Sequence, residues 1–110
     1  MTHPSVDASL RVLADAQRRR VIEYLRGQGP REATLEDLAA HLRSYPDAPT
    51  DRIRGQDRIR VALVQKHLPK LSDQGVVEWD RQRERARYRQ NDVVESVLDA
   101  LGEESVPAEA

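Results

Sequence analysis

The chain has 110 residues, of which 38% are hydrophobic and 34% charged, and it contains no cysteine and no phenylalanine. This length fits one domain with one modest core, and the lack of cysteine excludes disulfides, thiolate nucleophiles and cysteine metal sites. There is no apolar run of membrane-spanning length and no charged-then-apolar leader, so we expect an intracellular, cytoplasmic protein.

The formal net charge of −1 conceals an uneven distribution of charge along the chain. Residues 1–57 hold nine basic and nine acidic side chains, residues 58–89 hold nine and four, and residues 90–110 hold none and six. All but two of the basic residues are arginine, which binds phosphate and guanine bidentately. Genomic codon bias can explain the number of arginines, but it does not explain their clustering in the central segment.

The first expected element is a helix over residues 8–26, preceded by an N-terminal arm over residues 1–7. Asp15 marks a weak point, where its side chain can cap a second helical segment over residues 16–26. Gly27 and Pro30 follow that segment, as is typical beyond helix ends. Apolar side chains recur near the helical period, at Leu10, Leu13, Val21, Ile22 and Leu25.

The second expected helix covers residues 34–44. Thr34 and Asp37 form a variant of the capping box, with Asp in place of the usual Glu. The apolar stripe consists of Leu35, Leu38, Ala39 and Leu42. Residues 45–56 follow as a proline-rich and glycine-containing loop, which is longer than the connection of about 3–4 residues usual in a helix-turn-helix.

The third expected helix runs from an Asp57 cap to residue 74, before Gly75. The spacing of its apolar residues predicts an inward face made of Val61, Val64, Leu68 and Leu71. The opposite face then presents Ile59, Ala62, Lys66 and Lys70, with Leu63 falling towards it. Pro69 predicts a kink near residues 65–68, because proline has no backbone donor and crowds the preceding turn.

A hairpin follows, with strands over residues 76–79 and 86–89 and a polar turn over residues 80–85. A last helix over residues 92–101 is capped by Asn91 and ended by Gly102. Residues 102–110 are expected to be a disordered acidic tail. The order predicts a mainly α fold with a small β-hairpin: a winged helix-turn-helix with a three-helix core, a wing and a C-terminal helix, over residues 8–101.

Three segments of the chain resemble ArsR-type regulators: residues 13–25 their opening helix, residues 33–39 their second helix, and residues 67–77 the end of their recognition helix. The run His67-Leu68-Pro69-Lys70-Leu71 is closer still to an uncharacterised winged-helix domain common in halophilic archaea. The resemblance covers residues 9–89 and implies an archaeal DNA-binding transcription regulator. The metal-sensing cysteines of many ArsR proteins are missing here, so metal sensing is not implied.

A recognition helix inserts its N-terminal half into the major groove, so its outward side chains are candidates for DNA contact. Arg58, Ala62, Gln65 and Lys66 are the candidates for base edges, and Ala62 is small enough to allow close approach. The full set on this helix is Arg58, Arg60, Ala62, Gln65, Lys66 and Lys70. The alternative is an ordinary solvated helix face.

The predicted wing carries arginine at every second position, and alternate residues of a strand share one face. Ala86 and Tyr88 are expected to face the core. The candidates for phosphate or minor-groove contact are Arg81, Arg83, Arg85 and Arg87, with Arg89 beyond them. The alternative is a solubilising hairpin balanced by Asp80 and Glu84.

Other polar residues are expected to be structural. Within the run from Arg18 to Arg20, we expect one side chain to pair with Glu23, and phosphate contact by another is an alternative. His67 is expected to be packed and hydrogen-bonded, and a His41–His67 metal pair is a minor alternative. No nucleophile–base pair or phosphate loop stands out, so we expect no enzyme activity, no cofactor and no metal.

The leading hypothesis is a sequence-specific regulator that binds double-stranded DNA as a homodimer through its N- and C-terminal helices. The alternative is a winged-helix module that binds an acidic protein through residues 81–89. Neither hypothesis involves a membrane.

Overall fold

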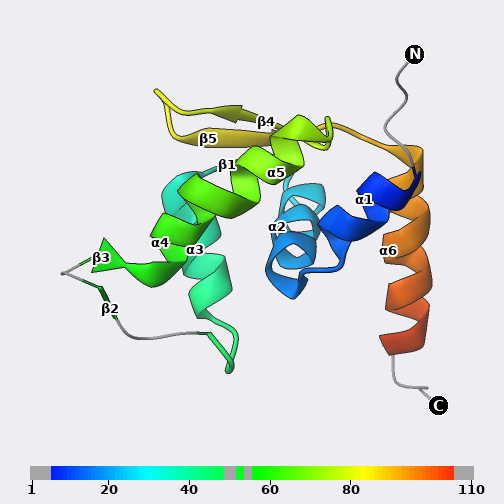
Figure 1. The fold of residues 1–110 in the computed structure, drawn as a ribbon, viewed down its shortest axis with the longest axis horizontal. Helices are drawn as coiled ribbons and strands as arrows, with labels where there is room; N and C mark the ends of the chain where they lie inside the picture. The colour runs from blue at the N-terminus through cyan, green and yellow to red at the C-terminus, as the bar shows by residue number, and fades with distance from the viewer. Residues whose placement is uncertain (1–5, 49–51, 54–55, 106–110) are drawn as a thin grey trace.

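The computed structural model describes residues 6–48, 52–53 and 56–105, with side chains for residues 8–48 and 57–101 (Figure 1). It is mainly helical with a small three-stranded antiparallel sheet, which confirms the expected fold class. In chain order the elements are α1 (Val6–Leu13), α2 (Ala16–Arg26), β1 (Glu32–Thr34), α3 (Leu35–Arg43), β2 (Arg52–Ile53), β3 (Gln56–Asp57), α4 (Arg58–Ala62), the π-helical turn η1 (Leu63–His67), α5 (Leu68–Asp73), β4 (Val77–Asp80), β5 (Arg85–Tyr88) and α6 (Asp92–Ser105).

The helix expected over residues 8–26 is divided at Asp15. The Asp15 side chain accepts a 2.7 Å hydrogen bond from the backbone N–H of Gln17 and so caps α2, which confirms the second segment. Helix α1 begins at Val6, two residues inside the expected N-terminal arm. The rest of that arm lies outside the described residues.

The capping box at the start of α3 is confirmed. Thr34 Oγ1 accepts the N–H of Asp37 at 3.1 Å, and the Asp37 carboxylate accepts the N–H of Thr34 at 3.4 Å. The sequence did not predict β1, which pairs antiparallel with β5 and aligns Ala33 with Ala86. Three residues are too few to show the alternation by which a strand is recognised.

The segment expected to be a plain loop over residues 45–56 contains a short two-stranded ribbon. Strands β2 and β3 pair antiparallel, with Arg52 opposite Asp57 and Ile53 opposite Gln56. The expectation was therefore wrong for these positions. Residues 45–48 form neither helix nor strand, as expected for a loop, and positions 49–51 and 54–55 lie outside the described residues.

The third expected helix forms as α4, η1 and α5 in succession. Asp57 caps it by accepting the N–H of Ile59 at 3.0 Å. The irregularity that Pro69 predicted is the π-turn, in which the N–H of Leu68 binds the carbonyl of Leu63, five residues earlier. A wider turn before Pro69 relieves the crowding between its ring and the carbonyl four residues back.

The π-turn changes which side chains face the core. Ile59 and Leu63 are buried and Val61 is only half-buried, so the expected faces were wrong at these three positions. Val64 is half-buried and packs against the core, as its expected inward position requires. Each residue of an α-helix advances the face by about 100°, so one additional residue in the turn shifts the following side chains by that angle. Leu63 and Leu68, five residues apart, therefore both lie in the core.

The hairpin confirms the expected alternation on the return strand. Ala86 and Tyr88 are buried and Arg87 is exposed, and the strand order is β1-β5-β4. The strand bounds differ by one residue from the expected ones, because β4 begins at Val77 and β5 ends at Tyr88. Gly75 precedes the hairpin with a φ of 71°, a left-handed conformation that favours glycine.

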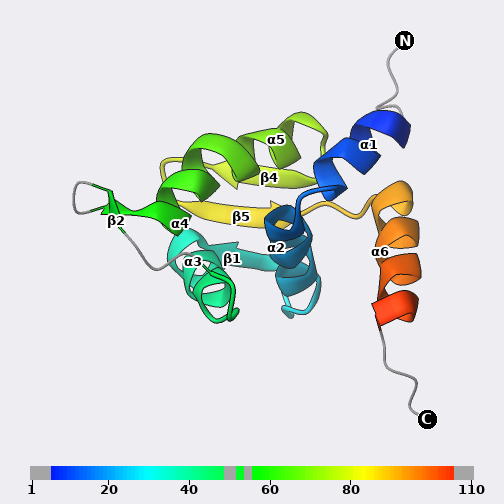
Figure 2. The same cartoon turned by 60° about the horizontal axis from the view of Figure 1, so that its bottom comes forward.

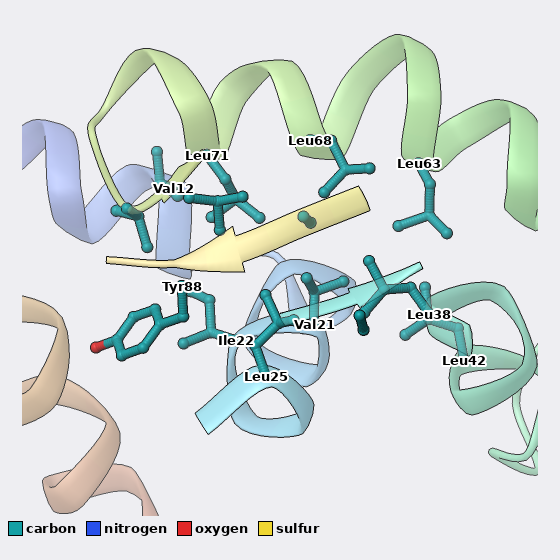
Figure 3. Close-up of a cluster of buried hydrophobic side chains, with 14 of the residues drawn as sticks. Val12, Val21, Ile22, Leu25, Leu38, Leu42, Leu63, Leu68, Leu71 and Tyr88 are labelled. Carbon is teal, nitrogen blue, oxygen red and sulfur yellow. The ribbon is translucent and has the colours of Figure 1, made fainter. Parts of the chain in front are cut away.

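The core is formed by the inner face of the sheet and by side chains of α1, α2, α3, the α4–η1–α5 helix and α6. Figure 3 shows Leu63, Leu68 and Leu71 on one side of this cluster, opposite side chains of α2 and α3. Those opposite side chains include Val21, Ile22, Leu25, Leu38 and Leu42.

Helix α6 packs on α1 and continues through Gly102 to Ser105, so the expected end at Gly102 was wrong. Val94 and Leu98 are buried, and Arg26 forms a 2.7 Å ion pair with Glu95. The Tyr88 hydroxyl also donates to Glu95. The end of the expected tail, residues 106–110, lies outside the described part of the chain. No helix in that part has the length and apolar character needed to cross a membrane.

Candidate nucleic-acid interface

The N-terminal part of the α4–η1–α5 helix lies at one end of the molecule, between two projecting features. These features are the turn between β4 and β5 and the β2–β3 ribbon, and both lie at the left in Figures 1 and 2. Helix α6 lies at the opposite end in both views. The fold therefore separates the wing turn and the N-terminal part of this helix from α6.

Most of the polar candidates on the helix are exposed on its outer side. Arg58, Gln65, Lys66 and Lys70 are exposed, and Ala62 is half-buried among them. The structure thus brings these predicted residues together along one helix. Ile59 does not belong to this face, because it is buried.

Arg60 has a different position from the other helix candidates. Its guanidinium forms ion pairs with Glu36 at the start of α3 and, at 3.2 Å, with both carboxylate oxygens of Glu84 in the wing turn. The side chain is only about a third exposed. Arg60 therefore joins three segments, and two carboxylates neutralise its charge.

The wing turn is held in place on the helical core. Asp80 Oδ1 accepts the N–H groups of Gln82 and Arg83 at 3.0 and 3.1 Å. Glu84 has a φ of 54°, and its carbonyl accepts the N–H of Leu35 at 2.8 Å. A non-glycine residue in the left-handed region costs about 1–2 kcal/mol, so these contacts stabilise an intrinsically unfavourable turn.

Arg81 and Arg83 project from this turn into solvent. The Arg83 side chain is 81% exposed, and its nearest carboxylate is Asp80 at 3.9 Å. Arg81 is also exposed, and no ion pair joins it to any residue whose side chain the structure describes. These two arginines are the cationic groups of the wing turn.

The remaining wing arginines lie on the outer face of the sheet among carboxylates. Arg85 lies 3.6 Å from Glu32 of β1, and Arg87 is aligned with Glu32 on one side and Glu78 on the other. Arg89 forms an ion pair with Glu78. The alternating arginines therefore do not form one basic surface, because β1 contributes an acid that the hairpin sequence does not contain.

The arginines of α2 mainly hold the end of α1. Arg18 is buried, and its Nε donates to the Val12 carbonyl at 2.7 Å. Arg19 donates to the Leu13 carbonyl at the same distance. Arg20 pairs with Asp47 at 3.1 Å, where Glu23 was the expected partner for this run, and stacks on the Tyr45 ring.

His67 is 4% exposed and is packed and hydrogen-bonded, as predicted. An Arg18 Nη1 lies 3.3 Å from its Nδ1, and arginine can only donate, so the imidazole accepts there and carries its proton on Nε2. Burial lowers the pKa of His67 from its ordinary value of 6.5, an effect that Asp15 opposes and Arg18, Lys66 and Lys70 reinforce. The ring is therefore neutral at neutral pH.

The other histidine with a described side chain, His41, lies between the Tyr24 and Tyr45 rings, with centroid separations of 4.6 and 5.4 Å. Among residues with described side chains, no group of three or more His, Cys, Asp or Glu is arranged to hold a metal ion.

A protein-family model described as a domain of unknown function, DUF7344, matches residues 10–87. The chain belongs to the DUF7344 family. The DUF7344 match includes all of α2 to β4, half of α1 and most of β5, so it contains all the candidate DNA-contact residues from Arg58 to Arg87. Helix α6 follows the DUF7344 match. No curated protein and no solved structure matches the chain significantly.

Proposed function

We propose that this protein is a sequence-specific regulator of transcription that binds double-stranded DNA. The observation that supports the proposal best is the exposed cationic face of the α4–η1–α5 helix beside a wing turn that carries two exposed arginines. Duplex DNA is a dense line of phosphate charge, and its major groove admits one α-helix. The protein would act in the cytoplasm without catalysis or a cofactor.

The exposed residues divide into two kinds of DNA contact. Arg58, Ala62, Gln65 and Lys66 lie in the N-terminal part and middle of the helix, where a recognition helix reads base edges. Lys70 lies further along and suits a phosphate. From the wing turn, Arg81 and Arg83 can reach the backbone or the minor groove.

The other candidates have smaller roles in this proposal. Arg60 fixes the helix relative to the wing turn, because it is paired with Glu36 and Glu84. Arg85 and Arg87 are balanced by carboxylates on the outer sheet face. The same carboxylates disfavour the alternative in which residues 81–89 bind an acidic protein.

A homodimer would place two such helices on one duplex. Leu10 of α1 is 45% exposed and Leu101 of α6 is 38% exposed, and both helices lie away from the wing turn. These large apolar side chains suit a symmetric contact between two copies. Two-fold symmetry of the protein would then match a palindromic site.

The test is fluorescence anisotropy of a labelled random duplex titrated with protein, between about 50 and about 200 mM salt. Wild type should bind at low salt and weaken steeply as salt rises. Arg81→Ala/Arg83→Ala should reduce the slope of log affinity against log salt by about 2, one for each lost phosphate contact. The control Arg85→Ala/Arg87→Ala should change the slope far less.

Specificity is tested by selecting preferred sites from a random library. Lys66→Ala should then change the preferred sequence, because its contact is proposed to be with a base. Absence of duplex binding by the wild type at low salt would exclude the proposed function.

A further inference from the structure

A small hollow lies between α1 and α5, and its walls carry mostly positive charge. Its volume is about 240 Å³. Three cationic side chains line it, Arg11, Arg18 and Lys70, with Asp73 as the carboxylate among the lining residues. Gln74 adds an amide. The lining therefore has an excess of two positive charges and several hydrogen-bond donors.

Arg18 makes this hollow different from an ordinary basic surface. Its side chain is 8% exposed, and its two described hydrogen bonds go to neutral acceptors, the Val12 carbonyl and the His67 ring. No carboxylate with a described side chain lies within ion-pair distance of it. The Asp15 carboxylate interacts with Arg18 electrostatically without forming an ion pair with it. A guanidinium has five N–H groups, so Arg18 keeps donors for an anion in the hollow beyond its two described hydrogen bonds.

We propose that the hollow binds a small multivalent oxyanion of the phosphate class. The volume is below the roughly 300–1,000 Å³ of pockets for drug-sized ligands, and it exceeds the roughly 30 Å³ share of one water several-fold. It therefore accommodates a tetrahedral anion with a few waters. Guanidinium groups bind two oxygens of such an anion at once, and Lys70 supplies a further charged donor.

The bound anion would join α1 to the end of the long helix that is remote from the wing turn (Figures 1 and 2). Free phosphate and a phosphate of the DNA backbone share the same chemistry. The site is proposed for the free anion, because it faces α1 rather than the side occupied by the wing turn. The hollow shares Lys70 with the proposed DNA interface. The anion site is therefore tested on the protein without DNA.

The experiment is calorimetric titration of the protein with sodium phosphate, against sodium chloride of equal ionic strength. Phosphate should bind saturably with one site per chain. Lys70→Gln and Arg11→Gln should each weaken binding by about tenfold, as expected for the loss of one charge-assisted hydrogen bond. Asp73→Asn should strengthen binding, because it removes the carboxylate of the lining.

Lys66→Gln is the matched control, since Lys66 is exposed on the same helix but does not line the hollow. Its affinity for phosphate should equal that of wild type. Arg18→Lys keeps the positive charge and removes the planar guanidinium with its paired donors. It should weaken phosphate binding, and circular dichroism checks that the variant is folded.

The proposal is overturned if wild type shows no saturable phosphate binding, or if chloride gives the same heat. It is equally overturned if Lys66→Gln and Lys70→Gln weaken binding alike, because the effect would then be general surface charge. If the wild type binds phosphate but does not bind duplex DNA, the proposed function is rejected and the proposed anion site is retained.

Discussion

Arg60 shows why a basic residue in a sequence is not always part of a basic surface. Its spacing placed it among the DNA-binding candidates, yet its guanidinium lies between Glu36 of α3 and Glu84 of the wing turn. Both carboxylates are distant from Arg60 in sequence, so no local pattern reveals the contact. The consequence is a structural role that can be separated experimentally from nucleic-acid binding.

Arg60→Ala is expected to lower the free energy of unfolding by roughly 0.5–1.5 kcal/mol, the range for partly exposed ion pairs with good hydrogen bonds. Lys66→Ala, on the exposed face of the same helix, should change it by less than about 0.5 kcal/mol. Urea denaturation measures both. Equal effects of the two substitutions would contradict the role given to Arg60.

His67 predicts a pH dependence of stability. Because its pKa is lowered in the folded protein, the unfolded chain binds a proton more readily as the pH falls below about 6.5. Stability is therefore full at neutral pH and is lost as the pH falls from 6.5 towards the lowered pKa. His67→Asn keeps an acceptor for Arg18 and cannot be protonated in this range.

The measurement for His67 is the free energy of unfolding of wild type and His67→Asn at several pH values between about 7.5 and 5. The wild-type slope should exceed that of the variant below about pH 6.5. Burial also lowers the pKa of His41, so part of the pH dependence of stability comes from His41 and should persist in His67→Asn. His41→Asn is therefore the control variant. Identical slopes in wild type and His67→Asn would show that His67 does not resist protonation.

At the scale of elements, the sequence predicted best what depends on neighbouring residues. The caps at Asp15, Thr34, Asp57 and Asn91 all formed, since each needs only a short side chain within three residues of a free N–H. The strands β1, β2 and β3 were not predicted, because each is too short to show a pattern. They exist through pairing with another segment of the chain.

The π-turn was missed for a different reason. Pro69 marked the irregularity correctly, but the spacing of Val61, Val64, Leu68 and Leu71 fits an uninterrupted helix equally well. A π-turn rotates the side chains that precede it relative to the side chains that follow it. Only the packing of Ile59 and Leu63 against α3 and the rest of the core decides between the two registers.

Two truncations test this register. Leu63→Ala should reduce the free energy of unfolding by about 2–5 kcal/mol, because a completely buried leucine leaves a cavity. Val61→Ala, at a half-buried position, should cost about 1 kcal/mol or less. Denaturant unfolding of both variants is the measurement. A larger loss of stability for Val61→Ala than for Leu63→Ala would support an uninterrupted helix instead.

Considering the molecule as a whole, α6 lies at the end opposite the wing turn and α4 (Figure 1). Dimerisation through α1 and α6 would therefore leave both interfaces free. Leu10→Glu/Leu101→Glu should convert a dimer to a monomer while the monomer stays folded, because both side chains are substantially exposed. Sedimentation velocity measures this. A monomeric wild type at micromolar concentration would reject the dimer.

The uneven charge along the sequence predicted part of the candidate site. It identified the helix face and the wing turn, where Lys66, Arg81 and Arg83 are exposed. It failed to separate these from Arg85 and Arg87, because the acid opposite them, Glu32, comes from a strand more than fifty residues earlier. Net charge along a sequence does not reveal which charges a sheet brings together.

The most direct test of the account is an NMR titration of the isotope-labelled protein with duplex DNA. Amide shifts should change at Arg58 to Lys66 and at Arg81 to Arg83, and stay constant on the outer sheet face and along α6. Changes confined to α6 or to the face around Glu32 and Arg87, with the helix and wing turn unaffected, would contradict it.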